Sequence, residues 1–144
     1  VGGHCIPVDP WFLIDKYPRF TKQVLEARKI NNFKTEYVFK KLVNLISKFK
    51  LNSKKSPKIL CLGLSYKENS DDIRESPANN IFIKLKTKFK KVESFDPNID
   101  TQLSKSEIYD LIMNSDILIK LVNHREFNVD PLKSLINTKK KLNY

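Results

Sequence analysis

Apolar residues between Arg19 and Leu51 recur at three- and four-residue steps, with lysines in many of the positions between them. This spacing predicts an amphipathic helical segment, because residues three or four apart lie on one face of a helix. The polar stretch NNFKT at 31–35 is a candidate break that would divide the segment into two helices. Residues 1–18 contain three prolines, which block a long helix, so we expect an irregular segment there.

The pattern changes after the stretch LNSKKSP at 51–57, which is polar, ends in proline and is typical of a linker. Beyond it, short apolar runs alternate with helical patterns. The expected strands cover 58–66, 91–97 and 116–122, and the expected helices run from Ser76, with Pro77 at the first helical position, to about Phe89, from Ser104 to Asn114, and over 130–136. Strands separated by helices predict an α/β fold: a helical central segment followed by a small Rossmann-like domain with a parallel sheet.

The loop after the first expected strand, SYKENSDDIRES, is the most promising site. In open parallel sheets, ligands bind at the carboxyl ends of the strands. Lys67 and Arg74 lie in this loop, beside the helix that begins at Ser76. Two cations and the positive end of a helix dipole would suit a phosphate group. The alternative is an ordinary solvated loop in which Asp71 and Asp72 balance the cations.

The composition suits one globular domain, since 40% of the 144 residues are hydrophobic and 30% are charged. No apolar run reaches the roughly 18–20 residues that cross a bilayer, so we expect no membrane partner. Cys5 lies beside glycines and Cys61 lies in a distant apolar run. A disulfide framework is therefore not expected, and we predict a reducing, cytoplasmic setting.

The net charge of +11 comes almost entirely from lysines spread over the expected helices and loops. A nucleic-acid binder would add a recognition motif, or aromatic residues among the basic ones, and neither pattern is present. We interpret most of the charge as lysine-rich surface usage, with part of it available to an anionic ligand. No nucleic-acid partner is expected.

Glycine content narrows the possible functions further, because the chain has only Gly2, Gly3 and Gly63. A G-x-G-x-x-G fingerprint needs three glycines in one short turn, and a P-loop needs two spaced around a lysine. Neither loop can be built, so we expect no dinucleotide cofactor site in this chain. We expect no metal site either, because His124 has no second ligand at a suitable spacing.

Two stretches, VGGHCIPVDPWFLI at 1–14 and GLSYKENSDDIRESPA at 63–78, resemble the UDP-glucose/GDP-mannose dehydrogenase family. These enzymes oxidise the C6 alcohol of a nucleotide sugar to a carboxylate. The stretches HCIPVDPWF, EARKINNFKT, FDPNID and LVNHREF narrow the resemblance to the branch that acts on UDP-N-acetylhexosamines. His4 and Val8 stand where UDP-glucose enzymes typically have Ser and Lys. UDP-N-acetylmannosamine is favoured, and UDP-N-acetylglucosamine stays open because its enzymes share the His-Cys pattern.

The resemblance implies an NAD-binding domain, a central helical segment and a nucleotide-sugar domain, in that order. Residues 1–18 would then be a catalytic cysteine loop, 19–52 a helical dimerisation segment and 57–144 the UDP-sugar-binding domain. NAD would be bound mainly by a domain that this chain lacks, which agrees with its glycine content. We therefore expect the chain to be inactive alone, and the enzyme to be a homodimer or a higher homo-oligomer.

The family match also implies roles in the cysteine loop. Cys5 would attack the aldehyde intermediate to give a thiohemiacetal, which becomes a thioester that water releases as the acid. Gly2 and Gly3 would permit a tight turn and close approach of the substrate. Asp9 would position or activate the water, and His4 would shape the sugar pocket. The alternatives are a buried structural Cys5, a simple turn at Asp9 and a basic role for His4.

Other residues match the family more distantly. Lys67 and Arg74 would bind the diphosphate or shape the pocket around it. We expect Cys61 to be structural and His124 to fix a loop. Arg28 and Asn31 match a helical pattern of the family, so we interpret them as structural and interface residues. Asn137 stands where the family has an aspartate near its last strand.

Two functions of other classes remain open. The first is a module that binds UDP-sugars without chemistry, for which Cys5 would be dispensable. The second is a basic nucleic-acid-binding domain, whose association would depend strongly on salt concentration.

Overall fold

A four-stranded parallel sheet, in the order β2-β1-β3-β4, forms the centre of the domain in the computed structural model. The structure describes residues 1–53, 55–138 and 141–143. Along the chain the elements are α1 (Asp9–Lys16), α2 (Lys22–Ser53), β1 (Ile59–Leu62), α3 (Pro77–Lys88), β2 (Val92–Phe95), α4 (Lys105–Asn114), β3 (Ile117–Lys120), the 3₁₀ helix η1 (Arg125–Asn128), α5 (Leu132–Thr138) and β4 (Lys141–Asn143). The predicted α/β class with a parallel sheet is confirmed.

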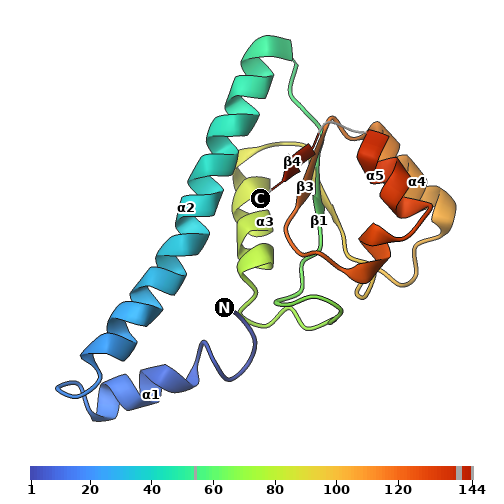
Figure 1. Cartoon of the computed structure of the whole chain (residues 1–144). Helices are drawn as coiled ribbons and strands as arrows, with labels where there is room; N and C mark the ends of the chain where they lie inside the picture. Colours follow the sequence, from blue (N-terminus) through green and yellow to red (C-terminus); the bar gives the residue numbers. More distant parts are fainter. Residues whose placement is uncertain (54, 139–140, 144) are drawn as a thin grey trace.

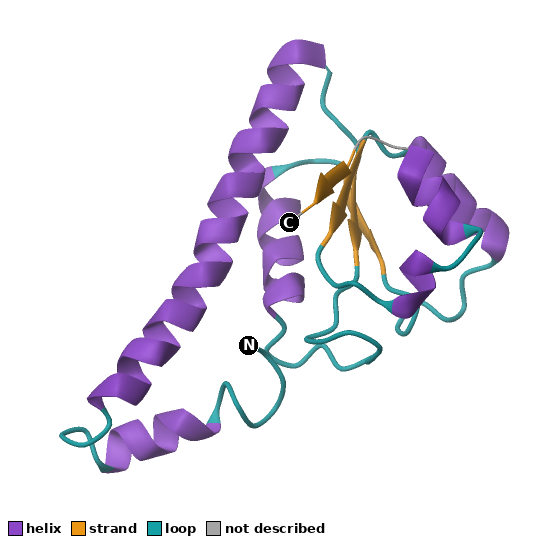
Figure 2. Cartoon of the chain, viewed as in Figure 1, coloured by secondary structure: helices purple, strands orange, loops and turns teal. Residues whose placement is uncertain are grey.

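Helices cover both faces of the sheet, as Figures 1 and 2 show. Alternate residues of a strand point to opposite faces. In β1, Ile59 and Cys61 therefore join a core with α2 and α3, whereas Leu60 and Leu62 join a second core with η1, α4 and α5. All four residues are buried. Because helices bury both faces of the sheet, every residue of β1 is apolar, whereas a strand with one exposed face would alternate apolar and polar residues.

Helix α2 is one continuous helix, so the expected break at 31–35 is wrong. Asparagine weakens helices because its side chain competes for nearby backbone groups. The Asn31 amide is instead engaged by the Val1 backbone: its Nδ2 donates to the Val1 carbonyl at 3.1 Å, and its Oδ1 accepts from the Val1 nitrogen at 2.6 Å. Further along, the fully buried Leu42 and Ile46 anchor α2 to the sheet.

The expectation of an irregular segment over 1–18 is wrong for α1. Pro10 lies in the first turn of this helix, where a backbone N–H has no partner within the helix and its loss costs little. Asp9 adds a negative charge at the helix amino terminus, which the helix dipole favours. Pro7 and Pro18 fall outside the helix and do not interrupt it.

The boundaries predicted for α3 and α4 are confirmed, whereas the helix expected over 130–136 is observed as α5, two residues further along the chain. Ser76 caps α3 by accepting a hydrogen bond from the Asn79 amide, and Ser104 forms a capping box with Glu107 at the start of α4. The strands are shorter than the apolar runs that predicted them. Asn137 lies in α5 rather than next to the last strand.

Part of the expected linker at 51–57 is helical, because α2 continues to Ser53, and Lys54 lies outside the described residues. The lysine pair at 139–140 and Tyr144 lie outside them as well. No helix among the residues that the structure describes is long and apolar enough to cross a membrane.

Candidate functional site

The segment 65–76, called here the β1 loop, follows β1 at the carboxyl edge of the sheet. Its base is closed by a backbone hydrogen bond from the Tyr66 amide to the Asp72 carbonyl, at 2.9 Å. At its far end the Ser76 hydroxyl donates to the Leu64 carbonyl at 2.7 Å, which ties the start of α3 back to the end of β1. Lys67 and Arg74 therefore lie on a closed loop rather than on a freely extended segment.

Asp72 orients Arg74. The Nε and Nη2 atoms of Arg74 donate to the Asp72 carboxylate at distances between 2.7 and 3.1 Å, and the Arg74 amide donates to it at 2.9 Å. These hydrogen bonds and the guanidinium charge hold the pKa of the Asp72 carboxyl well below its usual range. The same pairing raises the pKa of Arg74. The alternative in which the aspartates balance the cations is thus correct for Asp72, and the pair also fixes the direction of the guanidinium.

His4 joins this pair from the amino-terminal segment. Its Nδ1 lies 3.6 Å from a carboxylate oxygen of Asp72 and 3.3 Å from Nη2 of Arg74. The structure therefore brings together His4 and Arg74, which are 70 positions apart in the sequence.

The two glycines allow the cysteine loop to lie directly on the β1 loop. The Gly3 amide donates to the Arg74 carbonyl at 3.1 Å. Gly3 has φ of +100°, and a Cβ there would lie 3.0–3.3 Å from the Tyr66 ring. A Cβ on Gly2 would lie 2.5 Å from the Glu75 carbonyl oxygen, a distance that no side chain tolerates. Figure 1 shows the amino terminus beside this loop, below the sheet.

Cys5 is exposed and follows the docked glycines. Its carbonyl accepts hydrogen bonds from the Val8 and Asp9 amides at 2.9 and 2.8 Å, and this turn leads into α1. Cys5 and Tyr66 are among the groups that raise the pKa of Arg74, so the thiol lies within electrostatic range of the guanidinium.

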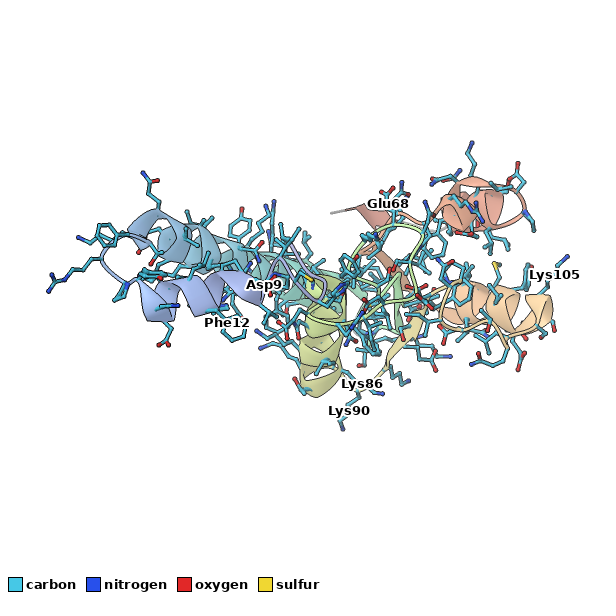
Figure 3. All side chains as sticks on the ribbon, turned by 90° about the horizontal axis from the view of Figure 1, so that it is seen from below. Asp9, Phe12, Glu68, Lys86, Lys90 and Lys105 are labelled. Atoms are coloured by element: carbon cyan, nitrogen blue, oxygen red, sulfur yellow. The ribbon has the colours of Figure 1, made fainter. Side chains whose placement is uncertain are left out.

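Asp9 and Lys67 are less closely joined to this cluster. Asp9 is exposed at the start of α1, where Figure 3 labels it, and its carboxylate makes no hydrogen bond or ion pair with the residues that the structure describes. The Lys67 ammonium lies 5.4 Å from the centre of the Tyr66 ring, the ring on which Gly3 packs. Of the predicted site residues, Gly2, Gly3, His4, Cys5 and Arg74 form one cluster and Lys67 lies at its edge.

Sequence reasoning missed one residue of the site, Tyr66, which packs against Gly3 and whose ring centre lies 5.4 Å from the Lys67 ammonium. Asp72 was expected only to balance the cations of the loop, whereas its carboxylate also orients the Arg74 guanidinium. The D-x-R spacing was a signal for this orientation, because a carboxylate two residues before an arginine can reach its guanidinium. Another feature, the fully buried pair of His124 and Asp96, lies at the same edge of the sheet.

Neither a metal nor a dinucleotide fits the residues present. No group of three or more His, Cys, Asp or Glu side chains with metal-binding geometry occurs within the described part of the chain. Gly63 is the single glycine of the turn after β1, and Gly2 and Gly3 are packed against the β1 loop. A glycine-rich phosphate loop therefore has no place here, and we derive no step through NAD on this chain.

A groove of about 750 Å³ lies at the opposite, amino-terminal edge of the sheet. It is bordered by residues of both charges, among them Lys58, Lys91, Glu93 and Asp110. Figure 3 shows Lys86 and Lys90, which also line it, extending from the end of α3. The groove contains none of the predicted site residues, and ligands of parallel sheets bind at the other edge, so we assign the site to the carboxyl edge.

A parallel α/β sheet whose carboxyl edge carries fixed cations next to a helix amino terminus is the arrangement of a nucleotide-binding domain. A family model described as "UDP-glucose/GDP-mannose dehydrogenase family, UDP binding domain" matches residues 60–143. The chain belongs to the UDP-glucose/GDP-mannose dehydrogenase family.

Individual relatives agree with this assignment. The chain is 36% identical over 137 residues to the UDP-N-acetyl-D-mannosamine dehydrogenase of Campylobacter jejuni, covering 88% of this chain and 32% of that protein. It is 35% identical over 146 residues to the NDP-N-acetyl-D-galactosaminuronic acid dehydrogenase of Ralstonia solanacearum, and this match covers 94% of this chain and 33% of that protein. The chain thus spans about a third of the length of the curated relatives it matches.

Solved structures show the same fold. The UDP-D-ManNAc dehydrogenase of Pyrococcus horikoshii superposes with a TM-score of 0.76 at 25% identity, covering 99% of this chain and 34% of that one. The UDP-N-acetyl-mannosamine dehydrogenase of Staphylococcus aureus, in a derivative structure, superposes with a TM-score of 0.71 at 31% identity. This match covers 98% of this chain and 32% of that one.

Proposed function

We propose that this chain is the UDP-sugar-binding portion of a UDP-N-acetyl-D-mannosamine 6-dehydrogenase, with Cys5 as its nucleophile. The observation that carries the proposal is the hydrogen bond between the Gly3 amide and the Arg74 carbonyl. This bond joins the loop of Cys5, the proposed nucleophile, to the loop of Arg74, the proposed anion-binding group. Such a juxtaposition suits a substrate that has both a reacting sugar and a diphosphate.

Arg74 is suited to bind the diphosphate. A guanidinium has five N–H donors, and here Nε and Nη2 are directed at Asp72 and His4. Among the described residues Nη1 has no hydrogen-bond partner, so its two N–H groups would be available to a phosphate, and the ion pair with Asp72 keeps the guanidinium in one orientation. Lys67 would add a second positive charge, and the amino terminus of α3 would add its dipole.

The proposed chemistry uses the thiolate of Cys5. Oxidation of a primary alcohol to a carboxylate removes two hydrides and adds one water. Loss of the first hydride gives the aldehyde, to which the thiolate adds to form a C–S bond and a thiohemiacetal. Loss of the second hydride and a proton converts the thiohemiacetal to a thioester, and water then cleaves the C–S bond to release the acid and restore the thiol. Asp9 would hold that water. Its exposed carboxylate would be oriented by the bound substrate or by a part of the enzyme outside this chain. His4 would contact the sugar.

The hydride acceptor is proposed to be NAD, bound by a part of the enzyme outside this chain. The relatives are about three times as long as the segment that they share with it. We expect the enzyme to act in the cytoplasm, where Cys5 would stay reduced.

The sugar is proposed from two observations. Relatives named for UDP-N-acetyl-D-mannosamine and for NDP-N-acetyl-D-galactosaminuronic acid both match the chain. His4 and Val8 occupy the cysteine loop in place of the Ser and Lys typical of UDP-glucose enzymes. UDP-N-acetylglucosamine is the alternative substrate, and binding of a UDP-sugar without chemistry is the alternative function.

Self-association through α1, the turn that follows it and the first half of α2 is part of the proposal. Large apolar side chains are exposed there, including Phe12, Phe20, Ile30 and Phe33, whose exposed fractions range from 63% to 89%. Figure 3 shows Phe12 on the outer side of α1. An apolar patch of this kind is typical of a surface that another protein chain covers, and we propose a homodimer.

The first test is calorimetric titration of this chain with UDP. We expect binding, and about tenfold weaker binding by Arg74→Gln, because one charge-assisted contact to phosphate is lost. Arg125→Gln is the matched control, since Arg125 is an exposed arginine at the same edge that pairs with Glu126. Equal affinities of the wild type and Arg74→Gln would exclude the assigned phosphate site.

The second test uses the gene product extended upstream of Val1, with NADH absorbance as the readout. Two NADH formed per UDP-N-acetylmannosamine would support the complete proposal, and turnover of only another UDP-sugar would change the substrate. Cys5→Ala should bind the UDP-sugar and produce no acid. Unchanged turnover by that variant would remove Cys5 as the nucleophile, and the absence of wild-type turnover with retained binding would favour the binding-only module.

A further inference from the structure

His124 connects the loops that follow β1, β2 and β3. Its side chain and that of Asp96 are both completely buried. Asp96 directly follows β2, and His124 lies in the loop after β3. Neither residue contacts Cys5 or Arg74 in the described structure, and neither has a part in the function proposed above.

The hydrogen bonds define the protonation of the imidazole. The Asn69 amide donates to Nδ1 of His124 at 3.0 Å, so Nδ1 is an acceptor and the ring proton is on Nε2. Nε2 lies 3.0 Å from a carboxylate oxygen of Asp96 and 3.2 Å from the Ser65 hydroxyl oxygen. That hydroxyl donates its own proton to the Lys67 carbonyl at 2.8 Å, and its oxygen can therefore accept from Nε2.

The imidazole consequently holds both ends of the turn 65–69. Ser65 is held at Nε2 and Asn69 at Nδ1, and Lys67 is the central residue of this turn. Asn69 has φ of 55°, a left-handed backbone conformation that asparagine adopts more readily than most other non-glycine residues. Two hydrogen bonds hold it there: its amide donates to Nδ1 of the imidazole, and its Oδ1 accepts from the Arg125 amide at 3.0 Å.

Asp96 completes the arrangement, because it keeps the imidazole oriented. Its carboxylate accepts from the Leu64 amide at 2.7 Å, from the Ser65 amide at 3.1 Å and from the Asn98 amide at 3.0 Å. Four donors, counting His124, compensate the buried charge. Substitution of Asp96 would remove the acceptor of three backbone amides at once. Substitution of His124 removes Nδ1, which accepts from the Asn69 amide and also lies 2.9 Å from Nδ2 of Asn98 in the loop after β2.

We propose that His124 is a positioning residue for UDP-sugar binding, which acts by holding the turn 65–69 so that Lys67 faces the diphosphate. This inference rests on the proposed role of Lys67. His124 is buried and would contact no ligand, but it would contribute part of the affinity of the site for the UDP-sugar.

Two amide variants separate the two sides of the ring. His124→Gln retains a donor near the Nε2 position and lacks the acceptor for the Asn69 amide. His124→Asn retains an acceptor near the Nδ1 position and lacks the donor to Asp96. We expect His124→Gln to bind UDP about tenfold more weakly and to lose hydrogen-exchange protection at the Asn69 amide. His124→Asn should recover most of the affinity and the protection.

A double-mutant cycle with Lys67→Ala tests whether His124 acts through Lys67. In the Lys67→Ala background, His124→Gln should weaken UDP binding less than about twofold, because the group that it positions is gone. Val92→Ala, at the amino-terminal end of β2, is the control for a general loss of stability and should leave UDP affinity unchanged.

Two results would overturn the inference. One is additive effects of His124→Gln and Lys67→Ala on UDP affinity. The other is unchanged exchange at Asn69 in His124→Gln, a readout that needs no ligand. Failure of the wild-type chain to bind UDP would instead refute the proposed function, and the exchange experiment would still decide whether His124 holds the turn.

Discussion

The Gly3 amide donates a hydrogen bond to the Arg74 carbonyl at 3.1 Å, across 71 positions of the sequence. The cysteine loop and the β1 loop are otherwise separated by α1, α2 and β1. Backbone atoms can approach this closely because Gly2 and Gly3 have no side chains that would meet Glu75 and Tyr66. The position of Cys5 relative to Arg74 thus depends on two glycines.

Gly2→Ala is expected to separate the cysteine loop from the β1 loop. The new methyl group would lie 2.5 Å from the Glu75 carbonyl oxygen, which is backbone and cannot move aside alone. Hydrogen exchange at the Gly3 amide should increase at least about fivefold, because the free energy of local opening falls by roughly 1–3 kcal/mol. The melting temperature should change little, since the loop contributes no residue to either buried core. Retained protection at Gly3 would contradict this account.

The two cysteines should differ sharply in reactivity. Burial raises the pKa of the Cys61 thiol to about 12, so Cys61 has almost no thiolate at neutral pH. Cys5 is exposed. Iodoacetamide at pH 7.5, followed by mass spectrometry of tryptic peptides, should modify Cys5 in the native chain and Cys61 only after unfolding. Cys5→Ser, as the control, should take up no label while folded. Equal labelling of the two thiols would show that the β1 strand opens readily.

The sheet domain was predictable from the sequence because its signals are local. Ser76 followed by Pro77 defines the start of α3, and the apolar run around Cys61 defines a buried strand. The strand ends were not predictable from hydrophobicity alone. The Leu64 amide leaves the ladder to bind the Asp96 carboxylate, although the apolar pattern continues past it.

The cysteine region and the buried network depend on contacts that no local pattern shows. Asn31 stays helical because its side chain binds Val1, 30 positions away. His124 was predicted to fix a loop, and its contacts with Asn69 agree with that interpretation. The partner that orients it, Asp96, lies in the stretch FDPNID that resembles the family, but no local pattern showed that its side chain would meet His124.

The pair of Asp72 and Arg74 should make stability depend on pH in acid. The folded-state pKa of Asp72 is depressed below its unfolded value of about 3.9, so the unfolded state binds more protons between the two values. The contribution of the pair is present above about pH 4 and is lost as the pH falls through the folded pKa. The difference in free energy of unfolding between the wild type and Asp72→Asn should therefore shrink between about pH 5 and pH 2.

Urea unfolding followed by circular dichroism at several pH values measures this difference. Asp71→Asn is the control, because it removes a neighbouring exposed carboxylate from the same loop. High salt should reduce the effect, since the pair is accessible to solvent. A constant difference between the wild type and Asp72→Asn over the whole range would show that the pair contributes nothing to stability.

The two serine caps should differ in their contribution, although both begin helices. Ser76 is 2% exposed, accepts from the Asn79 amide at 3.2 Å and also donates to the Leu64 carbonyl. Ser104 is exposed, and within the described part of the chain its hydroxyl forms hydrogen bonds only with Ser106 and Glu107 of its own capping segment. Ser76→Ala should cost about 2–3 kcal/mol of unfolding free energy, because a cap and a buried hydrogen bond are lost together. Ser104→Ala should cost about 1 kcal/mol.

Glycine at the same position separates the two contributions of Ser76. At an N-cap, glycine costs only a few tenths of a kcal/mol relative to serine, so Ser76→Gly keeps most of the cap and loses the bond to Leu64. Ser76→Gly should lower the free energy of unfolding by about 1–2 kcal/mol, which is less than the loss expected for Ser76→Ala. The Leu64 bond also ties α3 to the base of the β1 loop. UDP affinity should therefore fall in both Ser76 variants and stay unchanged in Ser104→Ala. Equal costs at Ser76 and Ser104 would mean that the link from Ser76 to β1 does not stabilise the loop that carries Lys67 and Arg74.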